Sequence, residues 1–136
     1  MTDSQPATVS QITTHVLDAQ RGKPAAGVPV ELYRRSGAGA GAGAGAAAGS
    51  ASGGDGWELV ASAVTDDDGR AKQLGPETIP NGEYRLRFDT GAYFASTQTE
   101  AFYPEVQLTF LVAEEGRHYH VPILLSPFAY STYRGS

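Results

Sequence analysis

Histidine and arginine side chains carry most of the chemistry that this sequence offers. His118 and His120 are separated by one residue, so in an extended strand both imidazole rings project from the same face. A third histidine, His15, and the arginine of an Asp-Gly-Arg turn, Arg70, lie far away in sequence. Imidazole titrates near neutral pH and can transfer protons, whereas arginine stays cationic and can hold an anion. The fold must therefore bring distant segments together before these side chains can act jointly.

A metal site is the first alternative, because aligned imidazoles are good zinc ligands. Zinc needs three or four ligands, and although His15 offers a third, there is no cysteine and no clear carboxylate to complete the set. Residues 66–68 are aspartates, which could suggest a calcium-binding loop. Counted from Asp66, however, the fifth position of such a loop is Arg70 instead of an oxygen ligand, and the sixth is Ala71 instead of glycine. No Gly-x-Ser-x-Gly nucleophile motif is present. The simplest alternative is that each histidine is an ordinary surface residue.

The composition describes one domain without cysteine. The chain has 136 residues, of which 40% are hydrophobic and 18% charged, which suits a single core. A formal net charge of -5 argues against a nucleic-acid partner. No apolar run approaches the roughly 18 residues of a membrane helix, so no membrane association is expected. Because the polar start of the chain lacks a secretion signal and cysteine is absent, we expect a cytoplasmic protein, with the peroxisome as the alternative.

Short stretches of alternating apolar and polar residues predict many strands, and one segment predicts a helix. The helix covers residues 90–96, with Asp89 or Thr90 as its N-cap. The predicted strands cover residues 11–18, 28–33, 57–64, 71–74, 83–89, 106–112, 118–125 and about 130–135. Frequent turn residues between such strands indicate an antiparallel β-sandwich or barrel.

Alternation also predicts which way the histidines point. In the strand 118–125, one face is apolar and the other carries His118 and His120; the apolar face consists of Tyr119, Val121, Ile123 and Leu125. In the strand 11–18, His15 shares a face with Thr13, opposite Ile12 and Val16. We therefore expect all three histidines to point away from the core, onto a solvated surface or an interface.

Residues 37–54 contain only glycine, alanine and serine. Their Gly-Ala alternation resembles silk, but a silk-like sheet needs many stacked copies. We expect a flexible loop between two strands, because lengthening a surface loop costs little stability. Residues 1–10 are expected to form a disordered leader, and residues 11–136 the domain that contains this insert.

Several motifs resemble those of the transthyretin-related 5-hydroxyisourate hydrolases, enzymes of urate breakdown. The most specific are His-Tyr-His-Val-Pro-Ile-Leu-Leu-Ser-Pro at 118–127 and Tyr-Ser-Thr-Tyr-Arg-Gly-Ser at 130–136. Further matches lie at residues 14–18, 22–25, 28–30, 68–70, 84–85, 88–91, 93–94 and 102–105. The resemblance covers about residues 11–136 except the insert, and Ala129 stands where the motif leads us to expect glycine.

The resemblance implies an all-β, transthyretin-like sandwich of two four-stranded antiparallel sheets with one short helix. It implies a homotetramer with active sites at the dimer–dimer interface, where the strands of His15 and His120 are neighbours. The catalytic residues of the family map onto His15, Arg70 and His120. Its substrate-binding set is His15, Arg70, Tyr133, Arg134, Gly135 and Ser136. His118 also matches the motif, without an assigned role.

The implied reaction hydrolyses 5-hydroxyisourate to 2-oxo-4-hydroxy-4-carboxy-5-ureidoimidazoline. A water molecule would be activated within the His15–His120 pair, with Arg70 as an electrophilic clamp and with no metal or organic cofactor. A hormone carrier of the same fold is the main rival, which the two histidines and the Tyr-Arg-Gly-Ser motif disfavour. A structural protein is a second rival, which only the silk-like run suggests.

Overall fold

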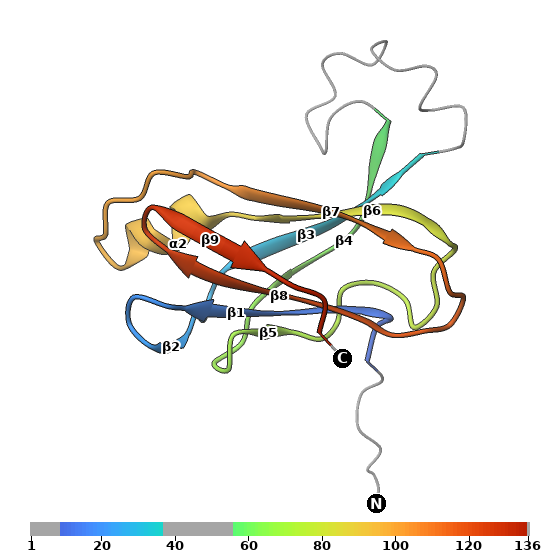
Figure 1. Ribbon diagram of the computed structural model, residues 1–136, viewed down its shortest axis with the longest axis horizontal. Helices are drawn as coiled ribbons and strands as arrows, with labels where there is room; N and C mark the ends of the chain where they lie inside the picture. Colours follow the sequence, from blue (N-terminus) through green and yellow to red (C-terminus); the bar gives the residue numbers. More distant parts are fainter. Residues whose placement is uncertain (1–8, 37–55, 136) are drawn as a thin grey trace, which may run out of the picture.

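Two β-sheets pack face to face in the part of the chain that the computed structural model describes, residues 9–36 and 56–135 (Figure 1). The first sheet consists of β1 (Ile12–Asp18), β2 (Lys23–Pro24), β5 (Arg70–Ala71), β8 (Tyr119–Ser126) and β9 (Ala129–Thr132). The second consists of β3 (Pro29–Arg35), β4 (Trp57–Val64), β6 (Gly82–Phe88) and β7 (Val106–Val112). The described residues contain one helix, α2 (Thr90–Ser96), which is too short to cross a membrane. The all-β fold class is therefore as predicted.

Two details of the sheets differ from the prediction of two four-stranded antiparallel sheets. The first sheet has five strands, in the order β2-β1-β8-β9, because the two-residue strands β2 and β5 both pair with the same edge of β1. Its central pair, β1 and β8, is parallel. A short turn forces sequential strands to run antiparallel, but β1 and β8 come from opposite ends of the chain and no turn dictates their direction. The second sheet, β4-β3-β6-β7, is antiparallel throughout.

The predicted element boundaries agree with the structure where alternation is regular and fail where it stops. Helix α2 covers its predicted range, and the Asp89 carboxylate caps it by accepting from the Ala92 N–H at 3.1 Å. The strand predicted at 71–74 is only β5, and the last strand ends at Thr132 instead of 135. Beyond Thr132 the chain returns to the sheet at one point, an isolated bridge between Gly135 and His120.

The core lies between the sheets and is built from their inward faces. The largest buried side chains include Ile12, Leu32, Tyr84, Leu86, Phe88, Ile123 and Leu125. Each contributes roughly 1.5–3 kcal/mol of burial free energy. Because Ile12 occupies an inner position of β1 and Ile123 and Leu125 occupy inner positions of β8, the alternate positions, which include His15 and His120, face outward from the first sheet.

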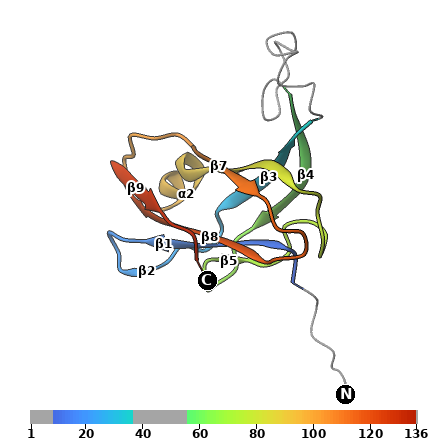
Figure 2. The same cartoon turned by 45° about the vertical axis from the view of Figure 1, so that its right-hand side comes forward.

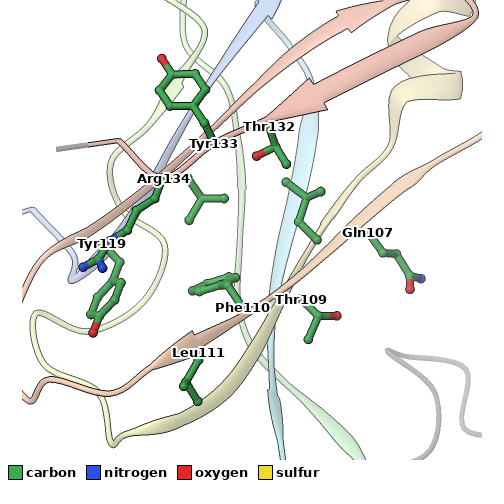
Figure 3. A pocket seen from close by; sticks show the side chains of 10 residues that line it. Gln107, Thr109, Phe110, Leu111, Tyr119, Thr132, Tyr133 and Arg134 are labelled. Carbon is green, nitrogen blue, oxygen red and sulfur yellow. The ribbon is translucent and has the colours of Figure 1, made fainter.

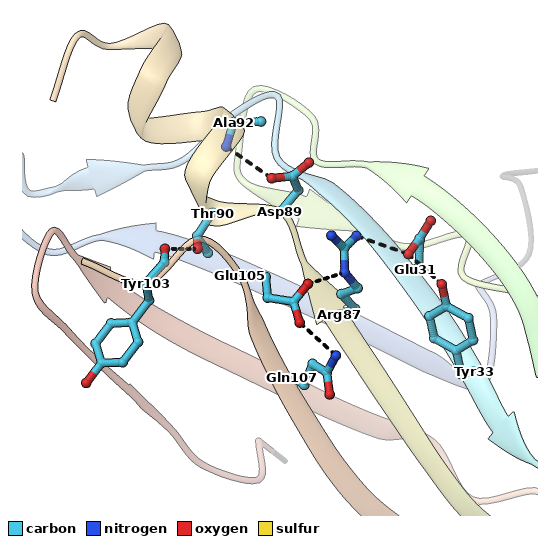
Figure 4. A network of polar contacts seen from close by, with 9 residues as sticks. All are labelled: Glu31, Tyr33, Arg87, Asp89, Thr90, Ala92, Tyr103, Glu105 and Gln107. Atoms are coloured by element: carbon cyan, nitrogen blue, oxygen red, sulfur yellow. Dashed lines mark hydrogen bonds and ion pairs between the residues drawn. The ribbon is translucent and has the colours of Figure 1, made fainter. Parts of the chain in front are cut away.

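Polar contacts tie the second sheet together on its outer face (Figure 4). The Arg87 guanidinium on β6 donates from Nε to Glu105 at 2.6 Å and from Nη1 to Glu31 on β3 at 3.2 Å. These ion pairs are partly exposed, so their main effect is to fix the positions of three neighbouring segments. In both views β3 and β7 of the second sheet lie above β1 and β8 of the first (Figures 1 and 2).

The two segments of special composition lie largely outside the described residues: residues 1–8 of the predicted leader and the whole Gly/Ala/Ser run 37–54. Ser10, which the prediction assigned to the leader, is buried. Its hydroxyl accepts from the Leu74 N–H at 2.8 Å and lies 2.9 Å from the Lys72 carbonyl oxygen. Ser10 thus belongs to the folded domain and anchors the segment after β5 beside the start of β1.

Candidate active site

Strand register places the three predicted catalytic residues on one face of the first sheet. In the parallel pair of β1 and β8, Thr13 lies opposite His120 and His15 lies opposite Pro122. On the other edge of β1, Arg70 is the direct partner of His15. Side chains of cross-strand partners project from the same face of a sheet. The outward face therefore carries a row of polar groups across β5, β1 and β8.

His120 is held from two sides. Its Nδ1 lies 2.8 Å from Thr13 Oγ1, and the same hydroxyl lies 2.9 Å from Nε2 of His118. On the other side of β8, the Gly135 N–H donates to the His120 carbonyl oxygen at 2.8 Å. A Cβ atom on Gly135 would come 2.7 Å from Cδ2 of the His120 ring, so only glycine allows this close approach. These contacts fix the ring between β1 and the end of the described chain.

The surroundings of His120 favour its neutral form. Burial is the main cause that lowers the pKa of His120 from its ordinary value of 6.5, and the positive charges of Arg70, His118 and His15 lower the pKa further. A weaker hydrogen-bond effect from Thr13 raises it. An imidazole of lowered pKa is neutral at pH 7 and has one ring nitrogen that can accept a proton.

A tight turn positions His15 and Arg70. Nε2 of His15 lies 2.8 Å from the Asp68 carbonyl oxygen, which can only accept, so Nε2 carries a hydrogen and Nδ1 of the neutral ring carries none. The Asp66 carboxylate closes the turn by accepting from the N–H groups of Asp68 at 2.9 Å and Arg70 at 3.0 Å. These backbone hydrogen bonds, the one from Arg70 first, lower the pKa of Asp66. Gly69 has a φ of +79°, which favours glycine.

A hollow of about 250 Å³ opens on this face. Its lining residues are Val9, Thr13, Thr14, Arg70, Lys72, His118 and His120. His15 does not line this hollow, although it pairs with Arg70 across the sheet and lies two residues from Thr13 on β1. Within residues 9–36 and 56–135, no three His, Cys, Asp or Glu side chains are grouped in a way that could hold a metal ion. With two cationic and two imidazole side chains, the hollow suits a polar substrate that carries negative charge or carbonyl oxygens.

The sequence predicted no role for several residues of this hollow, among them Thr13 and Lys72. It placed Thr13 on the same face as His15, but nothing in the sequence shows that its hydroxyl touches both His118 and His120. Lys72 follows Arg70 by two residues, the spacing that puts two side chains on one face of a strand. That spacing could have predicted Lys72 as a second positive charge beside Arg70 at the site.

The structure does not bring the whole terminal motif to the histidines. Tyr133 and Arg134 line a separate hollow of about 470 Å³ beside β7, together with Phe110 and Leu111 (Figure 3). The Arg134 guanidinium carbon lies 4.4 Å from the centroid of the Tyr119 ring, whereas Figure 3 shows the Tyr133 ring pointing away from this hollow. Of the motif, only Gly135 contacts His120, and Ser136 lies outside the described residues. Substrate binding by Tyr133, Arg134 and Ser136 stays a prediction.

Known proteins resemble this chain along nearly its whole length. Its sequence is 40% identical to 5-hydroxyisourate hydrolase of Salmonella typhimurium over 126 residues, 92% of this chain and 80% of the relative. The enzyme of the same name from Pseudomonas aeruginosa is 38% identical over 138 residues, 97% of this chain and 96% of the relative.

Solved structures agree with the sequence relatives. Klebsiella pneumoniae 5-hydroxyisourate hydrolase superposes with a TM-score of 0.71 at 34% identity, covering 92% of this chain and 98% of the other. Sea bream transthyretin in complex with thyroxine superposes with a TM-score of 0.73 at 32% identity, covering 92% and 94%. The predicted resemblance and transthyretin-like fold are confirmed. Since the model of the HIUase/Transthyretin family matches residues 12–135, the chain belongs to that family.

Proposed function

We propose that this chain hydrolyses 5-hydroxyisourate in urate breakdown and that its product is 2-oxo-4-hydroxy-4-carboxy-5-ureidoimidazoline. The relatives support a hydrolase, because the bacterial relatives from Salmonella and Pseudomonas aeruginosa, which match 92% and 97% of the chain, are named 5-hydroxyisourate hydrolases. The observation that supports the chemistry best is the row formed by Arg70, His15 and His120 across three paired strands. A ring-opening hydrolysis needs a base for water, a cation for the oxyanion and a proton for the leaving nitrogen.

In the proposed mechanism, His120 takes a proton from water at Nε2, the ring nitrogen that Thr13 does not contact. The hydroxide attacks the acyl carbon, the C–N bond breaks, and the proton is delivered to the leaving nitrogen. The lowered pKa of His120 supports the base role, because the imidazole starts neutral. His15 lies in the same row with a bare Nδ1, so it is the second candidate to move the proton.

Arg70 is proposed as the clamp that binds the developing oxyanion. Its planar guanidinium stays charged at all relevant pH values and can donate two parallel hydrogen bonds. The turn fixed by Asp66 holds the Arg70 backbone, so the guanidinium starts from a defined position. Lys72 lines the same hollow and adds a second positive charge without the planar geometry.

The site is proposed to be completed in a homotetramer, with the histidine face at the dimer–dimer interface. Several large apolar side chains are exposed on the single chain, among them Phe102 at 68% and Phe128 at 63%. Exposed apolar groups of this size are typical of protein interfaces. Light scattering of the purified protein would show a mass four times that of one chain.

A carrier function is the alternative that the similarity to thyroxine-bound transthyretin raises. Fold alone does not decide between the two functions. The hollow beside His120 carries Arg70 and Lys72, and this charge disfavours a largely apolar hormone. Calorimetric titration with thyroxine should therefore show no binding at this face.

The direct test is to follow the absorbance of freshly generated 5-hydroxyisourate with and without the protein. We expect decay to be much faster with the wild-type chain than in buffer. A His120→Ala variant, purified in the same way, controls for a contaminating hydrolase from the expression host. Decay at the buffer rate with folded wild-type protein would disprove the proposed function.

A further inference from the structure

Thr13 lies between two imidazoles, and the mechanism above gives it no part. Its side chain is only 5% exposed, and it is the direct cross-strand partner of His120 in the parallel pair of β1 and β8. Its single hydroxyl oxygen lies 2.8 Å from Nδ1 of His120 and 2.9 Å from Nε2 of His118. The ring centroids are 6.3 Å apart and the ring planes are inclined by 21°, while the one hydroxyl lies within hydrogen-bond distance of both rings.

The Thr13 hydroxyl restricts which nitrogens of His118 and His120 carry a hydrogen. A hydroxyl donates one hydrogen bond and accepts up to two, whereas each imidazole nitrogen either donates or accepts. Both contacts can be kept only if at most one of the two nitrogens lacks a hydrogen. When the Thr13 hydroxyl donates to His118, Nδ1 of His120 must carry its hydrogen, and Nε2 of a neutral His120 is then free to act as a base. When the hydroxyl donates to His120 instead, the hydrogen of a neutral His120 sits on Nε2.

We infer that Thr13 is a positioning residue that couples the protonation of His118 and His120 and passes a proton between them. This inference rests on the proposed hydrolase function. After His120 takes a proton from water, its Nδ1–H bond breaks as an O–H bond forms at Thr13, and the former hydroxyl hydrogen moves to Nε2 of His118. The positive charge then rests on His118 and returns by the reverse steps when the leaving nitrogen is protonated, so atoms and charge balance.

The charges around the two rings favour this transfer. His120 is half-buried, and the positive charges of Arg70 on β5, His118 on its own strand and His15 on β1 act on it; Lys72 lines the same hollow. His118 is exposed and borders a second hollow that the Glu77 carboxylate also lines. Burial and these positive charges make an extra proton costly on His120, and the Thr13 hydroxyl gives it a route to a ring that is exposed to solvent. The coupling gives His118, which the family motif left without a role, a defined task.

Kinetics of matched variants test the inference. Thr13→Val keeps the shape and removes the hydroxyl, whereas Thr13→Ser keeps the hydroxyl. Since the relay serves acid–base catalysis, we expect Thr13→Val to lower kcat by about tenfold or more with little change in KM, and Thr13→Ser to restore most of it. Thr90→Val is the control for the loss of a buried threonine hydroxyl. Thr90 is 1% exposed, donates to the Tyr103 carbonyl oxygen at 3.0 Å (Figure 4) and does not line the hollow beside His120.

Coupling separates a relay from a merely structural role. We expect His118→Gln to change the pH profile of kcat when it is introduced into the wild-type chain. Introduced into the Thr13→Val variant, it should leave the profile unchanged, because the hydroxyl that couples the two histidines is absent. In ring-nitrogen NMR titrations without substrate, protonation of His118 should move the His120 signals of the wild type and leave them unmoved in Thr13→Val. If Thr13→Val does not fold, Thr13→Ala provides the same comparison.

The outcomes are distinct from those of the function test. An inactive wild type would refute the hydrolase, while the NMR titrations would still decide whether Thr13 couples the histidines. An active wild type whose Thr13→Val variant keeps its kcat, its pH profile and coupled NMR titrations would overturn the relay. Equal loss of activity in Thr13→Val and Thr13→Ser would also overturn it, because the hydroxyl would then be irrelevant.

Discussion

Gly135 joins the end of the described chain to the ring of His120. Its N–H donates to the His120 carbonyl oxygen at 2.8 Å, and its Cα lies so close to the ring that an added Cβ would meet Cδ2 at 2.7 Å. A segment with only one bridge to the sheet thus sets how far the imidazole can move. The contact explains why the terminal motif matters to the site even though Tyr133 and Arg134 line another hollow.

The close approach of Gly135 leads to the first prediction. Gly135→Ala should push the His120 ring out of place and lower kcat/KM by about 10²-fold, the usual effect of misplacing a reacting group by about 1 Å. The change in thermal unfolding temperature should be small, because the segment beyond β9 makes few buried contacts. Wild-type kinetics in this variant would show that the ring position does not depend on Gly135.

Removing the proposed base gives the second prediction. His120→Ala should reduce turnover of 5-hydroxyisourate by about 10²-fold or more, the usual range for loss of an acid–base group. Thermal unfolding should confirm that the variant is folded. Turnover close to that of the wild type would exclude His120 from the chemical step and leave His15 as the candidate.

The third prediction concerns the shape of the cation. Arg70→Lys keeps the charge but loses the planar pair of donors, so kcat should fall even though the backbone hydrogen bonds of the turn remain. Arg34→Lys is the matched control, since Arg34 pairs with Glu58 on the second sheet, away from the histidine face. Equal kinetics of both variants would remove Arg70 from its role as clamp.

The lowered pKa of His120 gives the fourth prediction. In the folded state the ring resists protonation, so below pH 6.5 the unfolded chain binds more protons than the folded chain at this position. Stability from this group is therefore fully present above pH 6.5 and is lost as pH falls towards the folded pKa. Denaturant unfolding at a series of pH values should show this loss in the wild type. A His120→Gln variant should lack this component, and an identical pH dependence would contradict the prediction.

The fifth prediction is that the Gly/Ala/Ser run, residues 37–54, can be deleted without loss of activity or assembly. The base of the β3–β4 hairpin is already closed by hydrogen bonds from the Ser36 N–H and hydroxyl to the Gly56 carbonyl oxygen at 2.5 and 3.0 Å. At the same base, the guanidinium carbons of Arg35 and Arg85 lie 4.6 and 4.1 Å from the centroid of the Trp57 ring. The deletion leaves a three-residue loop between Arg35 and Trp57, a common hairpin length.

We therefore expect the deletion to leave hydroxyisourate turnover and the mass in light scattering unchanged. A reduced kcat with unchanged mass would give the segment a role in the reaction, whereas a changed mass would give it a role in assembly.

Alternation was enough to predict most of the fold and the direction of the histidines, because burial of Tyr119, Ile123 and Leu125 leaves His120 no other face. The position of Arg70 beside His15 came only with the family resemblance, since β5 has two residues and no periodicity of its own. The Thr13 bridge and the parallel pairing depend on how strands 100 residues apart align, which no local pattern encodes. The terminal motif suggested one site, whereas in the structure Gly135 contacts His120 while Tyr133 and Arg134 line a hollow elsewhere.

The parallel pairing of β1 and β8 has a consequence for biosynthesis. His15 leaves the ribosome long before His120, so the nascent chain lacks the proposed acid–base pair until β8 has been made. The second sheet forms from strands that are near in sequence, whereas closing the β1–β8 pair carries the entropy cost of a long loop. A chain truncated before β8 can thus retain all four strands of the second sheet and still lack the face proposed to be catalytic.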